Sequence, residues 1–281
     1  MFGPEYYRTA RLVAATYEDL LELRKAAKLR FRVVEAPWAK QMNADYLDRI
    51  REDEKWLLEA AKEHFREHPL WRWGTEVVMG LGARNTLFLL GYASPYMWRL
   101  RMDGTEEAVP VTSAGKIWQY WGLTPAGKLE SGVKARHNPK LKGRAWWIAT
   151  NILMARDPYY TAIYRCKKEY LAKVRGFEEY VSNPSSCPLY ASCLAKLARA
   201  AARKGGKPKT PACKAHMDGL AKLYLAKIIL SHAWEISARA EGMVIPRHRS
   251  YVRPKAHADD IPDEEALKGI LEGRAGEVWR R

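Results

Sequence analysis

Apolar residues recur at intervals of three and four along the first third of the chain, and this period restricts the fold more than any other feature of the sequence. One such stripe follows Thr16, and a second lies within residues 43–68. Positions spaced in this way share one face of an α-helix, so two long amphipathic helices are expected. The two stripes are Leu20, Leu23, Ala27, Phe31 and Val34, and Leu47, Ile50, Leu57, Ala61 and Phe65.

Local signals predict where these two helices begin and end. Thr16, with Asp19 three residues later, forms a capping box at the start of the first helix, and Pro37 ends it. Because only a short link leads to the second helix, the two are expected to pair as an antiparallel hairpin, an arm spanning residues 1–68. Two interpretations of the arm remain open. It is either a spacer or dimerisation element, which would make the protein a homo-oligomer, or a helical pair packed on the body of the same chain.

The remainder of the chain also indicates helices. No stretch of any length alternates apolar and polar residues with a period of two, as a half-buried strand would. Glycine and proline divide residues 70–155 into many short helices, and longer helices are expected at 158–174 and 214–240. The predicted fold class is therefore all-α. Beyond the arm, its expected regions are a body at 69–242 with an insertion at 181–217, and a loosely attached tail at 243–281.

Charge narrows the range of partners. The chain carries 48 Lys and Arg residues against 32 Asp and Glu, a net charge of +16, which favours a polyanionic partner such as nucleic acid. The longest apolar runs, at 87–90 and 145–149, are too short to cross a bilayer, and no signal segment opens the chain. We therefore expect a cytoplasmic protein without a membrane partner. Only two Gln and five Asn residues occur, which indicates a thermophilic source.

Two glycines mark a possible phosphate-binding turn. In the segment Val77 to Leu87, Gly80 and Gly82 alternate with apolar residues in the pattern of a helix-hairpin-helix module. Such glycines allow a tight turn whose backbone N–H groups, with the start of the following helix, point at a phosphate. Arg84 would reinforce that contact. The alternative interpretation is an ordinary turn between two helices.

Two segments are basic throughout. The first, residues 131–156, contains no acid and includes Trp146 and Trp147, whose rings could stack on bases. The second is the insertion at 181–217, which also contains no acid. A solvated surface of a thermophilic protein is the alternative for the first segment. The basic residues are Lys134, Arg136, Lys140, Lys142, Arg144 and Arg156, with His137 beside them, and Lys196, Arg199, Arg203, Lys204, Lys207, Lys209 and Lys214.

The order of several short motifs resembles the C-terminal half of the DEDD-type insertion-sequence transposases, the bridge-RNA-guided recombinases. The motifs are Gly80-Leu81-Gly82, Gly122-Leu123-Thr124-Pro125, Ser131-Gly132 and Asn138-Pro139-Lys140-Leu141. The resemblance covers roughly residues 16–175, including the helical arm. It implies a DNA-binding protein of mobile-element type, and it makes Ser131 the counterpart of the family's serine nucleophile.

The chain departs from that family in one important respect. The family's catalytic domain carries four acidic residues for divalent metal, and the 15 residues before Thr16 leave no room for it. The neighbours of Ser131 in sequence, Lys134, Arg136 and His137, could stabilise a phosphoryl transition state. Without the acidic quartet, however, a loop hydroxyl near phosphate is the expected role of Ser131.

Three cysteines and one histidine have the spacing of a metal site. Cys187 and Cys193 are followed by Cys213 and His216, each pair lying near turn-forming residues. Two such clusters supply the four ligands of a tetrahedral structural zinc ion, with no position left for catalytic water. A Cys187–Cys193 disulfide, or four unrelated residues, are the alternatives.

Together these features predict a DNA-binding protein with a helical arm, a helix-hairpin-helix body and a zinc-pinned basic insertion. Binding should be directed at the backbone of DNA, including structured DNA, or of RNA. A serine-dependent recombinase or transposase subunit that uses Ser131 is the alternative in the class of enzymes. A structural nucleoprotein that coats nucleic acid is the second alternative.

Overall fold

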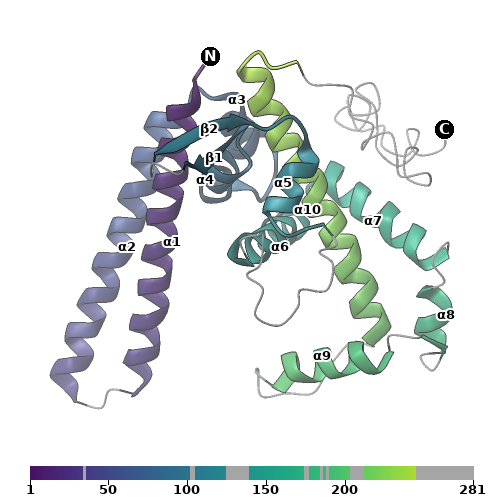
Figure 1. Ribbon diagram of the computed structural model, residues 1–281. Coiled ribbons are helices and arrows are strands. Elements are labelled where there is room, and N and C mark those ends of the chain that lie inside the picture. The colour runs from purple at the N-terminus through teal and green to yellow at the C-terminus, as the bar shows by residue number, and fades with distance from the viewer. Residues whose placement is uncertain are drawn as a thin grey trace. The chain divides into compact units, whose positions relative to one another are not determined.

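The computed structural model describes residues 1–33, 36–101, 105–124, 139–173, 177–183, 186–187, 190–202 and 212–244. Most of these residues are helical, and the strands among them are short, which confirms the predicted class (Figure 1). The elements are α1 (Pro4–Val33), α2 (Pro37–Phe65), α3 (Pro69–Arg72), the π-helical turn η1 (Trp73–Val77), α4 (Gly82–Tyr92), β1 (Tyr96–Leu100), β2 (Glu106–Pro110), α5 (Ala114–Tyr120), α6 (Pro139–Met154), α7 (Pro158–Lys173), α8 (Phe177–Ser182), α9 (Tyr190–Ala202) and α10 (Ala212–Ala240).

The chain divides into two compact units. The first contains the described residues within 1–117 and 230–246, and the second contains those within 118–229. Helix α10 contributes its first part to the second unit and its last part to the first. None of the helices among the described residues is long and apolar enough to cross a membrane.

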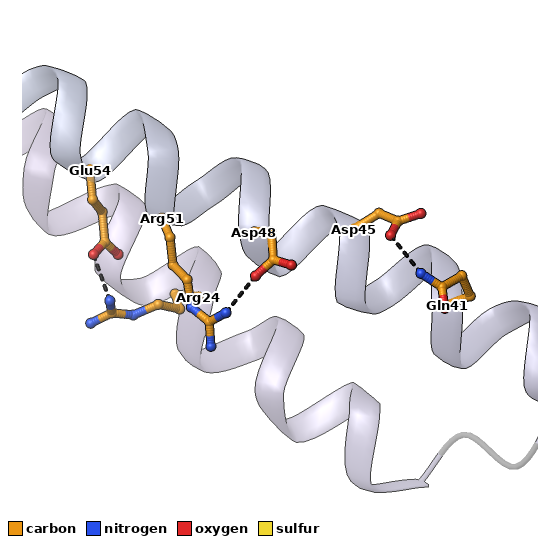
Figure 2. A network of polar contacts seen from close by, with 6 residues as sticks. All are labelled: Arg24, Gln41, Asp45, Asp48, Arg51 and Glu54. Carbon is orange, nitrogen blue, oxygen red and sulfur yellow. Dashed lines mark hydrogen bonds and ion pairs between the residues drawn. The ribbon is translucent and has the colours of Figure 1, made fainter.

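Helices α1 and α2 run side by side as the antiparallel hairpin that the sequence predicts (Figure 1). Ala27 of α1 packs against Leu47 and Ile50 of α2. An ion pair also joins the two helices, because the guanidinium of Arg24 lies 2.6 Å from a carboxylate oxygen of Glu54, a side chain that is nearly buried (Figure 2). A charged group at a core position favours one register of the two helices over others.

Figure 2 also shows two polar contacts that follow the surface of α2 alone. Arg51 pairs with Asp48 at 2.5 Å, and the side-chain amide of Gln41 donates to Asp45 at 2.8 Å. These contacts lie three and four residues apart along one helix, the spacing at which exposed side chains meet. They support α2 locally and do not join it to α1.

The ends of the two arm helices differ from those predicted. Thr16 is not a cap, because α1 already begins at Pro4, and the Thr16 hydroxyl donates to the carbonyl of Leu12 at 3.0 Å. Threonine makes this bond to the preceding turn when it lies inside a helix. Pro37 does not end a helix but begins α2, where proline is favoured since the first N–H of a helix has no intrahelical partner.

The expectation that no strand occurs is also wrong in one place. Strands β1 and β2 form an antiparallel ribbon in which Met97 is opposite Val109 and Trp98 is opposite Ala108. Each strand has five residues, too few for a period of two to stand out in the sequence. The tail predicted at 243–281 lies outside the described residues from residue 245 on.

Four buried residues of the first unit form a hydrogen-bonded group. We call Tyr7, His68, Ser237 and Glu241 the His68 cluster. His68 Nδ1 accepts from the backbone N–H of Leu70 at 3.1 Å, so the ring proton is on Nε2, which lies 2.9 Å from the Tyr7 hydroxyl. The hydroxyl of Tyr7 in turn lies 3.3 Å from both the Ser237 carbonyl and the Glu241 carboxylate. The cluster thereby ties the start of α1 to the end of α10.

The second unit has its own apolar cluster. Leu171 of α7, Phe177 of α8 and Met217 and Ala221 of α10 are buried against one another. Asp218 lies beside this cluster, where it accepts a hydrogen bond from Tyr164 and pairs with Lys222 at 2.9 Å. The first turns of α10 are thus held to α7 and α8 by apolar and polar contacts.

Candidate functional site

The segment between η1 and α4 forms a tight turn built on two glycines. Gly80 has a φ of 85° and Gly82 a φ of 64°, left-handed values that favour glycine. Between them Leu81 is buried, 2% exposed, and anchors the turn. Both glycines are exposed, and a Cβ added at Gly82 would meet no atom within 4 Å. The backbone of the turn is therefore open to a ligand.

Side chains on the inner face of α4 hold the turn in place. The buried side-chain amide of Asn85 donates to the carbonyl of Leu81 at 2.8 Å, and the Thr86 hydroxyl donates to the carbonyl of Gly82 at 2.8 Å. No side chain caps the start of α4. The first N–H groups of α4 therefore have neither an intrahelical partner nor a side-chain cap, next to the exposed glycines.

Arg84 lies in the first turn of α4 and is partly exposed. Its guanidinium pairs with no acid in the described part of the chain, in contrast to Arg8, which pairs with Glu106 at 3.1 Å. A cation without an acidic partner at the start of a helix adds to the positive potential of the helix dipole. Gly80, Gly82 and Arg84 thus form one exposed, positively polarised turn in the first unit, which we call the glycine turn.

The described part of the first basic segment is helix α6, in the second unit. Lys140, Gly143, Trp147 and Met154 are exposed and share one face of this helix by their spacing, and the Trp147 side chain is 60% exposed. Lys142 is also exposed, and Arg144 is partly exposed. Proteins that bind nucleic acids use cations for phosphate contact and exposed aromatic rings for base stacking.

Some lysines of the second unit already have partners inside it. Lys167 lies 4.3 Å from the centre of the Tyr170 ring and 4.7 Å from that of Tyr224. Lys222 lies 5.4 Å from the centre of the Trp146 ring, in addition to its ion pair with Asp218. These charges stabilise the fold, so net charge alone overstates the number of cations that can reach a ligand.

Several residues of the predicted sites lie outside the described residues. They are Ser131, Lys134, Arg136, His137, Arg203 and Lys204. In the insertion, Arg199 of α9 is described and exposed, and its Nε donates to the carbonyl of Ala195 at 3.2 Å. The predicted role of Ser131 therefore stays a prediction.

The four predicted metal ligands come together in the second unit; we call them the cysteine cluster. The Cys193 sulfur lies 3.3 Å from Nδ1 of His216, and Cys213 is hydrogen-bonded to Cys187. Cys187 and Cys213 are buried. Burial, the hydrogen bond to Cys187 and the nearby Cys187 and Cys193 raise the pKa of the Cys213 thiol to about 11.

The cysteine cluster is made of two contacting pairs. All four cysteines of the chain, including Cys166 on α7, are free thiols. No group of three or more His, Cys, Asp and Glu side chains in the described ranges is arranged so that it could hold a metal ion as it stands. The ring of His216 also packs edge-on against Phe177, with 5.4 Å between ring centres, which fixes the imidazole next to the apolar cluster.

Asn85 and the members of the His68 cluster are not among the site residues that the sequence predicts. Asn85 could have been suspected, since an asparagine four residues after a turn carbonyl can donate back to it. Nothing local marks the His68 cluster, whose members are far apart in the chain.

Comparison with protein-family models, with curated proteins and with solved structures finds no match.

Proposed function

We propose that this protein binds DNA through its phosphate backbone. The observation that carries the proposal is the glycine turn: two glycines with left-handed backbone, exposed and open, at the uncapped start of α4. Backbone N–H groups at such a turn suit a phosphate because they combine hydrogen-bond donors with the positive end of the helix dipole. Arg84 adds a charge at the same turn.

The basic segments of the second unit supply further phosphate contacts in this proposal. Lys142 of α6 and Arg199 of α9 are exposed cations, and Trp147 offers a ring for stacking where bases are accessible. The basic insertion would be pinned by a structural zinc ion at the cysteine cluster. Contacts of this kind follow the phosphate backbone, so binding should be salt-dependent and weak in sequence preference.

The glycine turn can be tested against a closely matched control. Gly82→Ala should weaken binding of a short labelled DNA duplex by about tenfold, or about 1.4 kcal/mol, since the added methyl group blocks the approach of phosphate. Gly242 is the control, because its φ is 69° and a Cβ there also meets no atom within 4 Å. Both substitutions strain the backbone by about 1 kcal/mol, and only the first should change affinity.

The salt dependence separates phosphate contact from other kinds of binding. Arg84→Gln should lower the slope of log affinity against log salt by about one, with little change in base preference. Equal affinities for Gly82→Ala and Gly242→Ala, or an affinity that does not change with salt, would contradict the proposal. Titrations of duplex, junction, single strand and RNA at one salt concentration identify the preferred form.

A further inference from the structure

Helix α9, within the insertion, is a short helix whose described side chains are little buried. Helix α9 has 13 residues, and none of its described side chains is buried. Leu194 is 43% exposed. Helices shorter than about 12–15 residues are marginal in water, and in proteins the burial of an apolar face usually stabilises them. The described side chains of α9 therefore contribute little apolar burial to fix the helix to the rest of its unit.

The contacts that the described side chains of α9 make with α10 lie at the start of α9. Cys193 lies in the second turn, against His216 of α10, and Cys187 lies just before α9, against Cys213 in the first turn of α10. Figure 1 shows the starts of α9 and α10 beside one another, as these contacts require. A turn closed by the Tyr190 N–H and the Cys187 carbonyl, 3.0 Å apart, connects Cys187 to the helix.

We propose that Cys187, Cys193, Cys213 and His216 bind one zinc ion, which fixes the start of α9 to the start of α10. The three sulfurs and Nδ1 of His216 are the ligands, because Nδ1 already faces Cys193. On binding, each thiol releases a proton to solvent and the neutral imidazole donates a lone pair. Coordination replaces both hydrogen-bonded pairs, so the side chains turn from one another toward the ion.

The surroundings of the cysteine cluster suit this chemistry. Cys213 lies in the first turn of α10 and Cys187 just before α9, so these ligands lie at the starts of the two helices that the ion would join. Cys187 and Cys193 precede residues 203–211 in the chain, and Cys213 and His216 follow them. One ion would therefore join two parts of the chain that are well separated in sequence. Four protein ligands leave no open position, which makes the site structural. The proposal does not depend on nucleic-acid binding.

A Cys187–Cys193 disulfide is less consistent with the contacts. Cys187 is paired with Cys213, and Cys193 with His216, so neither cysteine has the other as its hydrogen-bonding partner. A disulfide would also leave Cys213 and His216 without a role in joining α9 to α10. Counting free thiols in the denatured protein distinguishes the two forms, because the zinc form contains four free thiols and the disulfide form two.

The experiment measures metal in the purified full-length chain. The wild type should carry about one zinc ion per chain, and Co²⁺ exchanged into it should give the intense absorption of a cobalt–thiolate bond. Cys213→Ser should lose most of the zinc. Cys166→Ser is the matched control, because Cys166 lies on α7 and is not one of the four proposed ligands, and it should keep the full amount.

The wild type alone is enough to overturn the proposal. Well under one zinc per chain after growth with added zinc, no cobalt–thiolate absorption on titration with Co²⁺, or two free thiols instead of four would each contradict it. If Cys213→Ser does not fold, His216→Ala provides the same comparison at a partly buried ligand. Zinc retained in full by both variants would also overturn the proposal.

Discussion

The His68 cluster and the cysteine cluster both join segments that are far apart in the chain, but they do so with different chemistry. In the His68 cluster, both ring nitrogens of His68 and the Tyr7 hydroxyl have partners of the opposite kind, and Glu241 also accepts from the N–H groups of Phe2 and Gly3. In the cysteine cluster, the partners are thiols and an imidazole, which form weak hydrogen bonds.

The two clusters also differ in how much buried apolar structure surrounds them. Tyr7 and His68 are fully buried, and the rings of Phe2 and Tyr6 pack on His68. The cysteine cluster instead lies at the start of α9, a helix with no buried side chain among those described. Where apolar burial and complementary hydrogen bonds act together, a fold needs no ion. Where both are weak, the zinc ion that we propose would supply the stability.

The largest expected effect compares burial in the two regions. Phe65→Ala, beside the His68 cluster, should lower the free energy of unfolding by about 3–5 kcal/mol, because the ring is fully buried. Leu194→Ala on α9 should lower it by less than about 0.5 kcal/mol, since this side chain is already exposed. Urea denaturation followed by fluorescence measures both. Similar losses for the two variants would show that α9 is packed.

The next effect concerns pH. Burial lowers the pKa of His68 from its ordinary value of 6.5 to about 4. As pH falls from about 7 to 4, the unfolded chain takes up a proton that the folded chain does not, so stability falls, by up to about 3 kcal/mol. The side chains that face His68, Tyr6 and Tyr7, stay neutral across this range, since burial raises the pKa of each.

A variant isolates the contribution of His68 to this pH dependence. Burial also lowers the pKa of His232 to about 4, so the wild-type curve contains two contributions of the same sign. His68→Gln should remove one of them and make the curve of unfolding free energy against pH less steep below about 6.5. Parallel curves for the wild type and the variant between pH 7 and 4 would exclude a buried neutral His68.

The smallest effect compares single polar groups. Tyr7→Phe removes one hydroxyl and leaves His68 Nε2 buried without its partner, so we expect a loss of about 1–3 kcal/mol. In the metal-free chain, Cys193→Ala removes a weak bond at a half-buried site and should cost less than about 0.5 kcal/mol. Thermal unfolding of both variants measures the difference. A larger loss for Cys193→Ala would show that the thiol pair stabilises the fold without metal.

Much of the helical architecture was predictable because helix signals are local. The period of the apolar stripes predicts the α1–α2 hairpin, and the expected helices at 158–174 and 214–240 agree closely with α7 and α10. The ends of helices were less predictable. Threonine and proline each occur at several positions in helices, so their presence alone does not fix where a helix ends. Thr16 lies inside α1 and Pro37 begins α2, in contrast to the positions that their local pattern favours.

The candidate sites likewise contain features that local sequence predicts and features that it does not. The sequence by itself determined the glycine turn, since the turn depends on residues only a few positions apart, and it marked the four Cys and His residues by their short spacing without showing which of them meet. Only the tertiary structure decided that Cys187 meets Cys213, that Glu54 is a buried partner of Arg24, and that Tyr7 joins His68 to Glu241. These contacts link residues 26 to 234 positions apart, and such pairings arise from the packing of whole helices, which no local period records.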